Sequence, residues 1–593
     1  MLPLTVITAE RLNEWNLSCE RLEDYVTDYI QLPYLSNAEI ASLVRLLEEH
    51  DSLGYLKDAT TEERENALAR RAGRQLLVAL HEATLGKAFA DIVEDEFNDL
   101  RPDSAQELYL NVCFLNQFDV PVRAGVISRV QDLPFAEFKE KLFRPLEHVV
   151  FDAFDPSLHD YVYTARHPHI AEIVVARILR NSSQIHARMV LLLSALNVDY
   201  SVDRVALRKL VRGRTLGEQF ADYQAVADIF AVARGVAGDD PYVMHQMAIY
   251  EMHRPNGNLE KAHEYLVTAS RLAEHDRTID HSFAELAFLR MQRASSEAEK
   301  ARFRLEARRA ARKLTDKPRT PHGYHTLAKI AIEQLREVLT QSDAAERDID
   351  RAVEEAEQSL EDGLQRFPQS EYMLEAEAEL SKVIVDEERA TKALERAFAA
   401  NPRSSFIAVR LAKTAIATED FAKARKVLET ALDVNPNEKK LHFNLARVLM
   451  ALNEDADSVT YHLYHSFTLG DTNFEAQFWY ARQLYVLDRI PEAREMFKQL
   501  HSAAVPFDLR NSTRGFVAEP NGSQKIFFGR LVSLETTYAF IERDGRGDWV
   551  FWHMDDTTDE TLWQRLHEGD RVRFCMGFSF RGARAVEVEL ASS

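Results

Sequence analysis

The middle of the sequence repeats with a period of 34 residues, and this period constrains the fold more than any other feature. Four sets of residues keep the step: Pro368, Pro402 and Pro436; Ala356, Ala390 and Ala424; Leu360, Leu394 and Leu428; Gly363, Ala397 and Ala431. Small residues let two helices approach closely, and a proline ends a helix because it lacks an amide hydrogen. The period therefore predicts repeated helix pairs, each closed by a proline turn.

This pattern resembles the tetratricopeptide repeat. Weaker copies extend it upstream to Met247-Ala248 and downstream to Phe497. We expect degenerate repeats over residues 220–503, stacked into an α-solenoid whose concave surface binds a protein partner. Only 20 of the 593 residues are glycine, about half the usual share of roughly 7%. A mostly α-helical chain is therefore predicted.

Residues 1–219 lack this period. Within 1–103, Leu4–Thr8 reads as a short buried strand, and the longer segments Arg21–Glu49 and Ala67–Leu100 have the apolar spacing of helices. Within 104–219, three short helices and a hairpin are predicted, at Leu108–Phe118, Ala124–Val130, Phe135–Phe143 and Val149–Phe154 with Tyr161–Ala165. Three helices and a hairpin indicate a winged-helix-like domain, although another small helical module would fit the same pattern.

The last 81 residues, 513–593, have a different character, because they hold 8 of the 20 glycines. Five alternating runs separated by turn clusters predict a small β-barrel. The runs are Lys525–Leu534, Tyr538–Arg543, Trp549–His553, Arg571–Met576 and Ala585–Leu590. Strand alternation puts Tyr538 and Phe540 on one sheet face, and Phe551 and His553 on one face of the next strand. Together these four side chains could form a platform on which bases stack.

Thr536-Thr-Tyr-Ala-Phe-Ile541 and Val550-Phe-Trp-His-Met554 resemble the two ribonucleoprotein motifs of the cold-shock domain. The resemblance implies an OB-fold barrel that binds single-stranded RNA or DNA through the four platform residues. The sequence departs from the family at Ser533, Thr536 and Met554, where the family has tryptophan, lysine and an aromatic residue. A barrel that serves as a structural or protein-docking module is the alternative.

Two stretches near the N-terminus resemble signal-transduction ATPases with numerous domains (STAND proteins). Leu4-Thr-Val-Ile-Thr-Ala-Glu-Arg11 is similar to their sensor strand, and Gln31–Ile40 is similar to the start of their helical lid. The resemblance implies that Arg11 senses the terminal phosphate of a nucleotide and that His167, at a strand–helix junction, senses the diphosphate. The simpler alternatives are that Arg11 is a surface or ion-paired arginine and that His167 is a helix-start histidine with a local partner.

A phosphate-binding loop is absent from the sequence. The motif requires Gly-x4-Gly-Lys-Ser/Thr, but the only Gly-Lys pair is Gly86-Lys87, with His81 in place of the first glycine. No other catalytic pattern is evident, so we lean towards a non-enzyme. ATP or ADP would be a cofactor only if another polypeptide supplied the missing half. His462 and His465, one helical turn apart, favour packing over zinc binding, since they have no evident third ligand.

Composition limits the remaining functions. A net charge of −22 argues against a protein that coats nucleic acid. No apolar stretch approaches about 18 residues, so no membrane span is expected, and three scattered cysteines fit the reducing cytoplasm. We predict a non-catalytic cytoplasmic sensor or scaffold with a protein partner, and the resemblance implies a bacterial antiviral defence or stress-signalling system. The alternatives are an adaptor that binds RNA or single-stranded DNA, and the regulatory half of an ATPase.

Overall fold

The computed structural model describes most of the chain from residue 36 onward. The segments outside the description are 1–35, 51–52, 54–59, 67–88, 133–145, 147–148, 166–167, 317–319, 342–344, 436, 504, 506–509, 511, 520–522, 558–562, 564 and 592–593. The chain divides into two compact units, Met1–Phe89 and Ala90–Ser593. In the first unit, α2 (Asn37–Glu49) begins at a capping box, in which Ser36 and Glu39 satisfy each other's backbone amides, and α3 spans Thr61–Asn66.

The second unit begins with a small domain of helices and a three-stranded sheet. Its helices are α5 (Phe89–Asp99), α6 (Asp103–Asn116), α7 (Ala124–Gln131) and α9 (Pro168–Ile178), and its strands are β1 (Val122–Arg123), β2 (Val150–Asp155) and β3 (Asp160–Ala165). The sheet has the antiparallel order β1-β3-β2. Two of the three expected short helices and the hairpin are confirmed. The expected helix Phe135–Phe143 and the strand Leu4–Thr8 lie outside the described residues.

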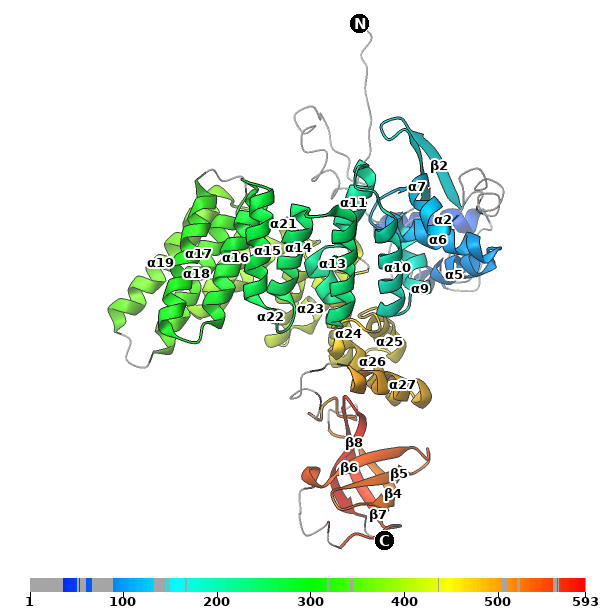
Figure 1. Ribbon diagram of the computed structural model, residues 1–593. Helices are drawn as coiled ribbons and strands as arrows, with labels where there is room; N and C mark the ends of the chain where they lie inside the picture. Colours follow the sequence, from blue (N-terminus) through cyan, green and yellow to red (C-terminus); the bar gives the residue numbers. More distant parts are fainter. Residues whose placement is uncertain are drawn as a thin grey trace. The chain divides into compact units, whose positions relative to one another are not determined.

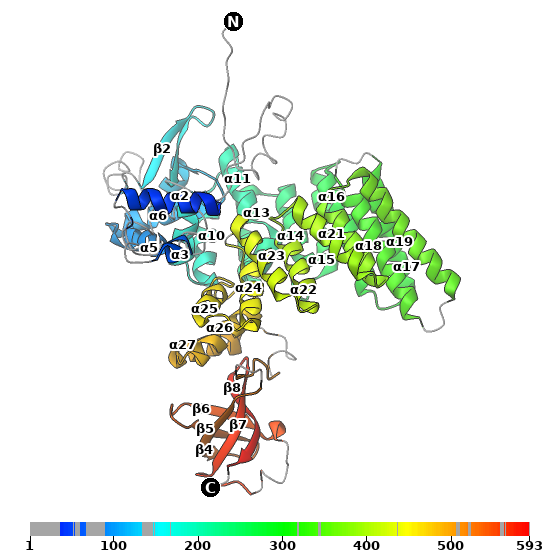
Figure 2. The same ribbon diagram turned by 180° about the vertical axis from the view of Figure 1, so that it is seen from behind.

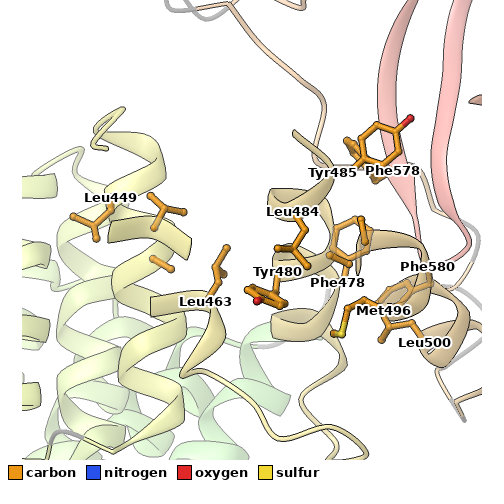
Figure 3. Close-up of a cluster of buried hydrophobic side chains, with 14 of the residues drawn as sticks. Leu449, Leu463, Phe478, Tyr480, Leu484, Tyr485, Met496, Leu500, Phe578 and Phe580 are labelled. Carbon is orange, nitrogen blue, oxygen red and sulfur yellow. The ribbon is translucent and has the colours of Figure 1, made fainter. Parts of the chain in front are cut away.

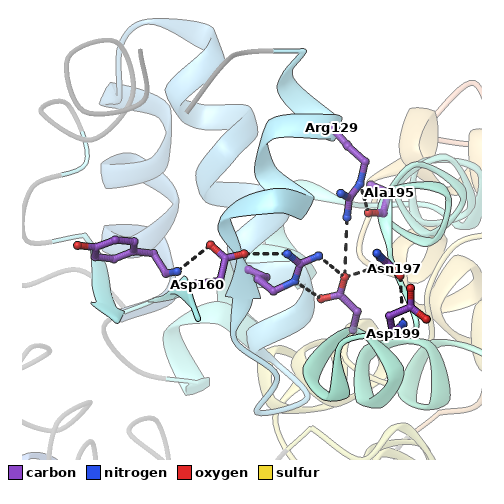
Figure 4. Close-up of polar contacts among 8 residues, drawn as sticks. Arg129, Asp160, Ala195, Asn197 and Asp199 are labelled. Atoms are coloured by element: carbon purple, nitrogen blue, oxygen red, sulfur yellow. Dashed lines mark hydrogen bonds and ion pairs between the residues drawn. The ribbon is translucent and has the colours of Figure 1, made fainter. Parts of the chain in front are cut away.

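Four helices, α10 (Ser182–Ala195), α11 (Ser201–Leu210), α12 (Gly213–Gln219) and α13 (Tyr223–Ala237), connect this domain to the repeats. An ion-pair network fixes α11 to the sheet (Figure 4). The Arg123 guanidinium, at the end of β1, donates to both carboxylate oxygens of Asp203 at 3.2 and 3.0 Å and to Asp160 at 2.7 Å. Arg129 lies 3.8 Å from the same Asp203 carboxylate. The network therefore joins β1, β3, α7 and α11.

Seven helix pairs follow in the described chain, and each pair contacts the next. Figure 1 and Figure 2 show the resulting stack of helices. The first helices are α14 (Pro241–His253), α16 (Arg277–Arg293), α18 (His322–Thr340), α20 (Glu371–Val383), α22 (Ser405–Ala417), α24 (Lys439–Ala451) and α26 (Phe474–Val486). The second helices are α15 (Leu259–Leu272), α17 (Glu297–Thr315), α19 (Glu346–Arg366), α21 (Glu387–Ala400), α23 (Phe421–Val434), α25 (Ala456–Tyr464) and α27 (Ile490–Ser502). The fold is thus a mostly helical, tetratricopeptide-like solenoid, as predicted.

The periodic alanines and leucines occupy the interfaces between these helices. Ala356, Ala390 and Ala424 are buried at equivalent places in α19, α21 and α23, and the leucines four residues later are buried as well. Gly363 shows why a small residue is needed one turn further along. A Cβ atom there would lie 2.2 Å from the terminal methyl carbon of Met373. The 34-residue period therefore reflects the positions at which neighbouring helices contact each other.

The C-terminal strands form a closed five-stranded barrel. They are β4 (Ile526–Leu534), β5 (Tyr538–Arg543), β6 (Trp549–His553), β7 (Arg571–Ser579) and β8 (Gly582–Leu590), and a 3-10 turn, η6, spans Met554–Asp556. The strand order is β4-β5-β6-β8-β7, with a parallel contact between β6 and β8. The predicted OB-like barrel is confirmed at the level of the fold.

The barrel core is continuous with the core of the last helix pair (Figure 3). The ring of Phe580 lies 5.1 Å from that of Phe478, and the ring of Phe578 lies 5.3 Å from that of Tyr485. The Tyr485 hydroxyl donates to the buried carboxylate of Asp548, which also accepts from Arg543 at 2.8 Å. The turn between β5 and β6 is thus bonded to α26. Within the described residues, no helix combines the length and apolar character needed to cross a membrane.

Candidate functional site

The outer face of β5 and β6 carries a group of aromatic side chains. Ala539 and Ile541 of β5, like Val550 and Trp552 of β6, point into the barrel core and are fully buried. Strand alternation therefore turns the intervening residues outward. Tyr538 is directly opposite His553, and Phe540 is directly opposite Phe551. The four residues that the sequence singled out thus share one face of the sheet.

The rings on this face contact one another. The Tyr538 and Phe551 rings are stacked with centroids 5.9 Å apart, and the Phe540 and Phe551 rings meet edge to face at 5.7 Å. His553 lies 6.3 Å from Phe551. These distances are typical of favourable aromatic pairs. We call Tyr538, Phe540, Trp549, Phe551 and His553 the aromatic face.

Trp549 belongs to this face but was not predicted as a site residue. Its ring lies 6.1 Å from that of Phe540, and 54% of the residue is exposed. The signal was present in the sequence, because Trp549 shares strand parity with Phe551 and His553. The segment that resembles the cold-shock motif begins one residue later, at Val550, and therefore does not include Trp549.

Charges around the aromatic face are mixed. Arg584 lies 5.7 Å from the Phe551 ring, but its guanidinium is paired with Asp556 at 2.5 Å. Arg530 of β4 is exposed and stands opposite Glu542 of β5. The face therefore offers stacking surface with little net positive charge. It could hold unpaired bases, while phosphate neutralisation would contribute little to binding.

A second group of polar and aromatic side chains lies on the first helices of the solenoid. Contacts link successive first helices, from α14 to α16, α16 to α18 and α18 to α20. In a curved stack the more closely spaced helices lie on the inner side, so these helices form the concave surface. The 34-residue period predicted a binding surface there but none of its residues.

Histidine and tyrosine rings line this surface. The His281 and His322 rings are 4.5 Å apart, and Tyr372 lies 5.1 Å from His322 and 5.6 Å from His325. Phe406, on α22, is exposed and lies beneath the guanidinium of Arg410. We call His281, His322, His325, Tyr372 and Phe406 the groove cluster. Burial, followed by the charges of His281 and His325, lowers the pKa of His322 to about 4.

The carboxylates beside the groove cluster are held by cations of the chain itself. Glu375 is paired with Arg410 and lies 3.3 Å from Nε2 of His325. Glu285 lies 3.4 Å from His253 and 3.7 Å from Arg214. Burial acts to raise the pKa of Glu285, but the hydrogen bond from His253 and the neighbouring positive charges lower it to about 2. Both carboxylates are thus already paired with arginines of this chain.

Three predicted features have a different outcome. Arg11 and His167 lie outside the described residues, so their nucleotide-sensing role stays a prediction. His462 contacts a third histidine, because its Nδ1 lies 2.8 Å from Nδ1 of His442. Nevertheless, the described part of the chain contains no group of three ligands placed to hold a metal ion.

A comparison with protein families agrees with the repeat architecture. The tetratricopeptide repeat family model matches residues 386–442, within the most regular part of the period. A thermophilic TPR protein of Thermus thermophilus is 16% identical over 35% of this chain and 99% of that chain, with a TM-score of 0.28. PilF of Pseudomonas aeruginosa is 16% identical over 38% and 91%, with a TM-score of 0.27. Yeast Tom70 is 15% identical over 79% and 91%, with a TM-score of 0.35. No curated protein sequence matches the chain.

Proposed function

We propose that this protein is a non-catalytic scaffold that binds a protein partner on the concave surface of its solenoid. The observation that carries the proposal is the groove cluster, where rings from three successive first helices adjoin one another and Tyr372 and Phe406 are exposed. Tetratricopeptide-like repeats generally serve as protein-interaction scaffolds, and a stacked solenoid offers a long concave surface for an extended segment. If the chain belongs to a STAND-type defence or stress-signalling system, this surface would be its sensing part.

Site-specific photo-crosslinking in cells tests the proposal. A benzoylphenylalanine replaces Tyr372 in the groove cluster or, as the matched control, Leu305, which is exposed on the second helix α17. We expect a discrete protein adduct from position 372 that is absent from position 305. The adduct should also disappear when Phe406→Ala is added. Equal adducts from both positions, or none from position 372, would contradict the proposal.

The aromatic face supports a second function, binding of single-stranded RNA or DNA. Five neighbouring rings on two adjacent strands are the specific observation, since each base can stack on any of them. The mixed charges around the face predict modest affinity and a weak dependence on salt. The alternative is that the same rings contact a protein.

The test uses the full chain with labelled single-stranded oligonucleotides at low salt. Truncating Tyr538 and Phe551 to alanine should weaken binding by roughly tenfold or more, because a stacked base contributes about 1–3 kcal/mol. Leu590→Ala, an exposed apolar truncation on β8, should leave the affinity unchanged. Binding that survives the double substitution, or no binding to any oligonucleotide, would exclude this function.

A further inference from the structure

The strand β2 forms an open edge of the three-stranded sheet. The sheet order β1-β3-β2 leaves one side of β2 without a neighbouring strand among the described residues. Figure 1 and Figure 2 show the β2–β3 hairpin extending away from the helices of its domain. An edge strand presents a row of backbone N–H and C=O groups that another strand can pair with. The feature is therefore a potential site of strand addition.

The side chains of β2 are unusual for such an edge. Phe151 and Phe154 are 49% and 53% exposed, although large aromatic side chains on a free edge promote association. The Phe154 ring meets that of Tyr161, on β3, edge to face at 5.4 Å. Phe151 lies on the opposite face of the strand, because strand side chains alternate. Each face of the hairpin thus offers an accessible ring beside the open edge.

The charge of the hairpin indicates what it can bind. Residues 149–165 contain three aspartates and no lysine or arginine. Asp160 is paired with Arg123, whereas Asp152 and Asp155 carry no ion pair with the described residues. Hydrogen bonds from the Ser157 side chain and backbone lower the pKa of Asp155, so this carboxyl group stays ionised. Phosphates would be repelled, and a second copy of the same edge would place like charges together.

We propose that the β2 edge binds an extended, cationic segment of a partner protein by antiparallel or parallel strand addition. Backbone pairing supplies the alignment. Because side chains of the bound segment alternate too, its lysines or arginines at even positions meet one face of β2, with Asp152 and Phe154, and those at odd positions meet the other, with Phe151 and Asp155. Carboxylates attract these cations directly, and the exposed rings attract them through cation–π contacts. The site is separate from the groove cluster and from the aromatic face, so its test is independent of theirs.

The experiment uses the full chain and a fluorescent seven-residue peptide of lysine and valine that carries lysine on both faces when it is extended. Glutamate replaces lysine in one control peptide, and a proline interrupts the centre of the other. We expect binding of the lysine peptide alone, together with slower amide hydrogen exchange at residues 150–155. Replacing both Asp152 and Asp155 with asparagine should weaken binding by roughly twofold to thirtyfold, because each exposed ion pair contributes about 0.2–1 kcal/mol.

A matched variant separates this site from general attraction to an acidic chain. Glu264→Gln with Glu306→Gln removes the same charge from exposed positions on α15 and α17 and should change the affinity by less than about twofold. Equal weakening by both double variants would overturn the proposal, as would protection that maps outside 150–155. A concentration-dependent dimer that is lost on Phe151→Ser with Phe154→Ser would assign the edge to a second copy and would also overturn it.

Discussion

At the scale of single residues, Arg123 holds several separate elements together. The residue is 3% exposed, and its partner Asp203 is 2% exposed. Its guanidinium also lies 3.5 Å from the centre of the Tyr200 ring. Asp203 in turn accepts from the backbone amide of Asn197 at 2.9 Å. Each charge is buried only because the other is present, so the loss of one partner costs more than the pair itself contributes.

Substituting Arg123 alone should therefore strongly destabilise this domain. We expect Arg123→Met to lower the free energy of unfolding of this domain by about 3–5 kcal/mol, because it leaves the Asp203 carboxylate buried and weakly paired. Arg123→Met combined with Asp203→Leu should recover a large part of that loss. Urea unfolding followed by fluorescence measures both effects, and a double variant no more stable than the single one would refute this reading.

His462 makes stability depend on pH. Burial, and then the charges of His442, His465 and Arg425, lower its pKa to about 3. The unfolded chain takes up a proton near pH 6.5, whereas the folded chain takes it up only near pH 3. The contribution of this residue is therefore complete above pH 6.5 and is lost as the pH falls towards 3.

As the pH falls from 7 to 5, the contribution of His462 to the free energy of unfolding should decrease by about 2 kcal/mol. His462→Asn should flatten this part of the pH profile of urea unfolding, while His501→Asn, at an exposed site on α27, should leave it unchanged. The explanation fails if both variants retain the wild-type slope.

At the scale of elements, the repeat depends on small residues where two helices touch. Ala424 of α23 is fully buried in the core that joins the helix pairs, whereas Ala422, two residues earlier, is exposed. The same substitution at these two positions therefore tests the packing alone, because the helix, the original residue and the added volume are the same in both variants.

Ala424→Leu should destabilise the solenoid by about 1–3 kcal/mol, since added methyl groups in a packed interface force side chains and backbone apart. Ala422→Leu should change stability by less than about 0.5 kcal/mol. Thermal unfolding monitored at the helical circular dichroism band distinguishes the two. Equal midpoints for these variants would show that the 34-residue period does not mark a tight contact.

The sequence predicted those elements whose signal is local. Ala356, Ala390 and Ala424 keep a fixed step, and the alternation from Tyr538 to His553 places the rings on one face. The groove cluster was missed because His281, His322 and Tyr372 come from three different repeats and do not follow the period. Likewise, no pattern in 149–165 shows that β2 lies at the sheet edge, because strand order depends on contacts distant in sequence.

At the scale of the whole second unit, the barrel and the last helix pair share one core. They also share a group of polar contacts, Tyr485 with Asp548 and Arg546 with Asp488, which we call the latch. Arg546 of the β5–β6 turn pairs with Asp488 at 2.8 Å, next to the bond between Tyr485 and Asp548. Arg482 donates to the backbone carbonyls of Gly515 and Phe516 at 2.6 and 3.0 Å. The strands that carry the aromatic face are thus tied at their connecting turn to α26.

Removing the Tyr485 hydroxyl should loosen this connection. Tyr485→Phe leaves the ring packed against Phe578 but takes one donor from the buried Asp548 carboxylate, at a cost of about 1–3 kcal/mol. Amide hydrogen exchange in residues 543–553 should accelerate, and Tyr464→Phe, at an exposed ring on α25, should not affect it. Unchanged exchange in Tyr485→Phe would exclude the latch.

The shared core also determines whether the protein can be studied as separate fragments. Cutting the chain near residue 503 would bring the rings of Phe478 and Phe497 on one fragment, and of Phe578 and Phe580 on the other, into water. Both fragments would then carry a fresh apolar patch that attracts other molecules, including each other. Binding measured with an isolated barrel would partly reflect this newly exposed apolar surface. Full-length variants with single substitutions are the sounder way to assign a ligand to either half.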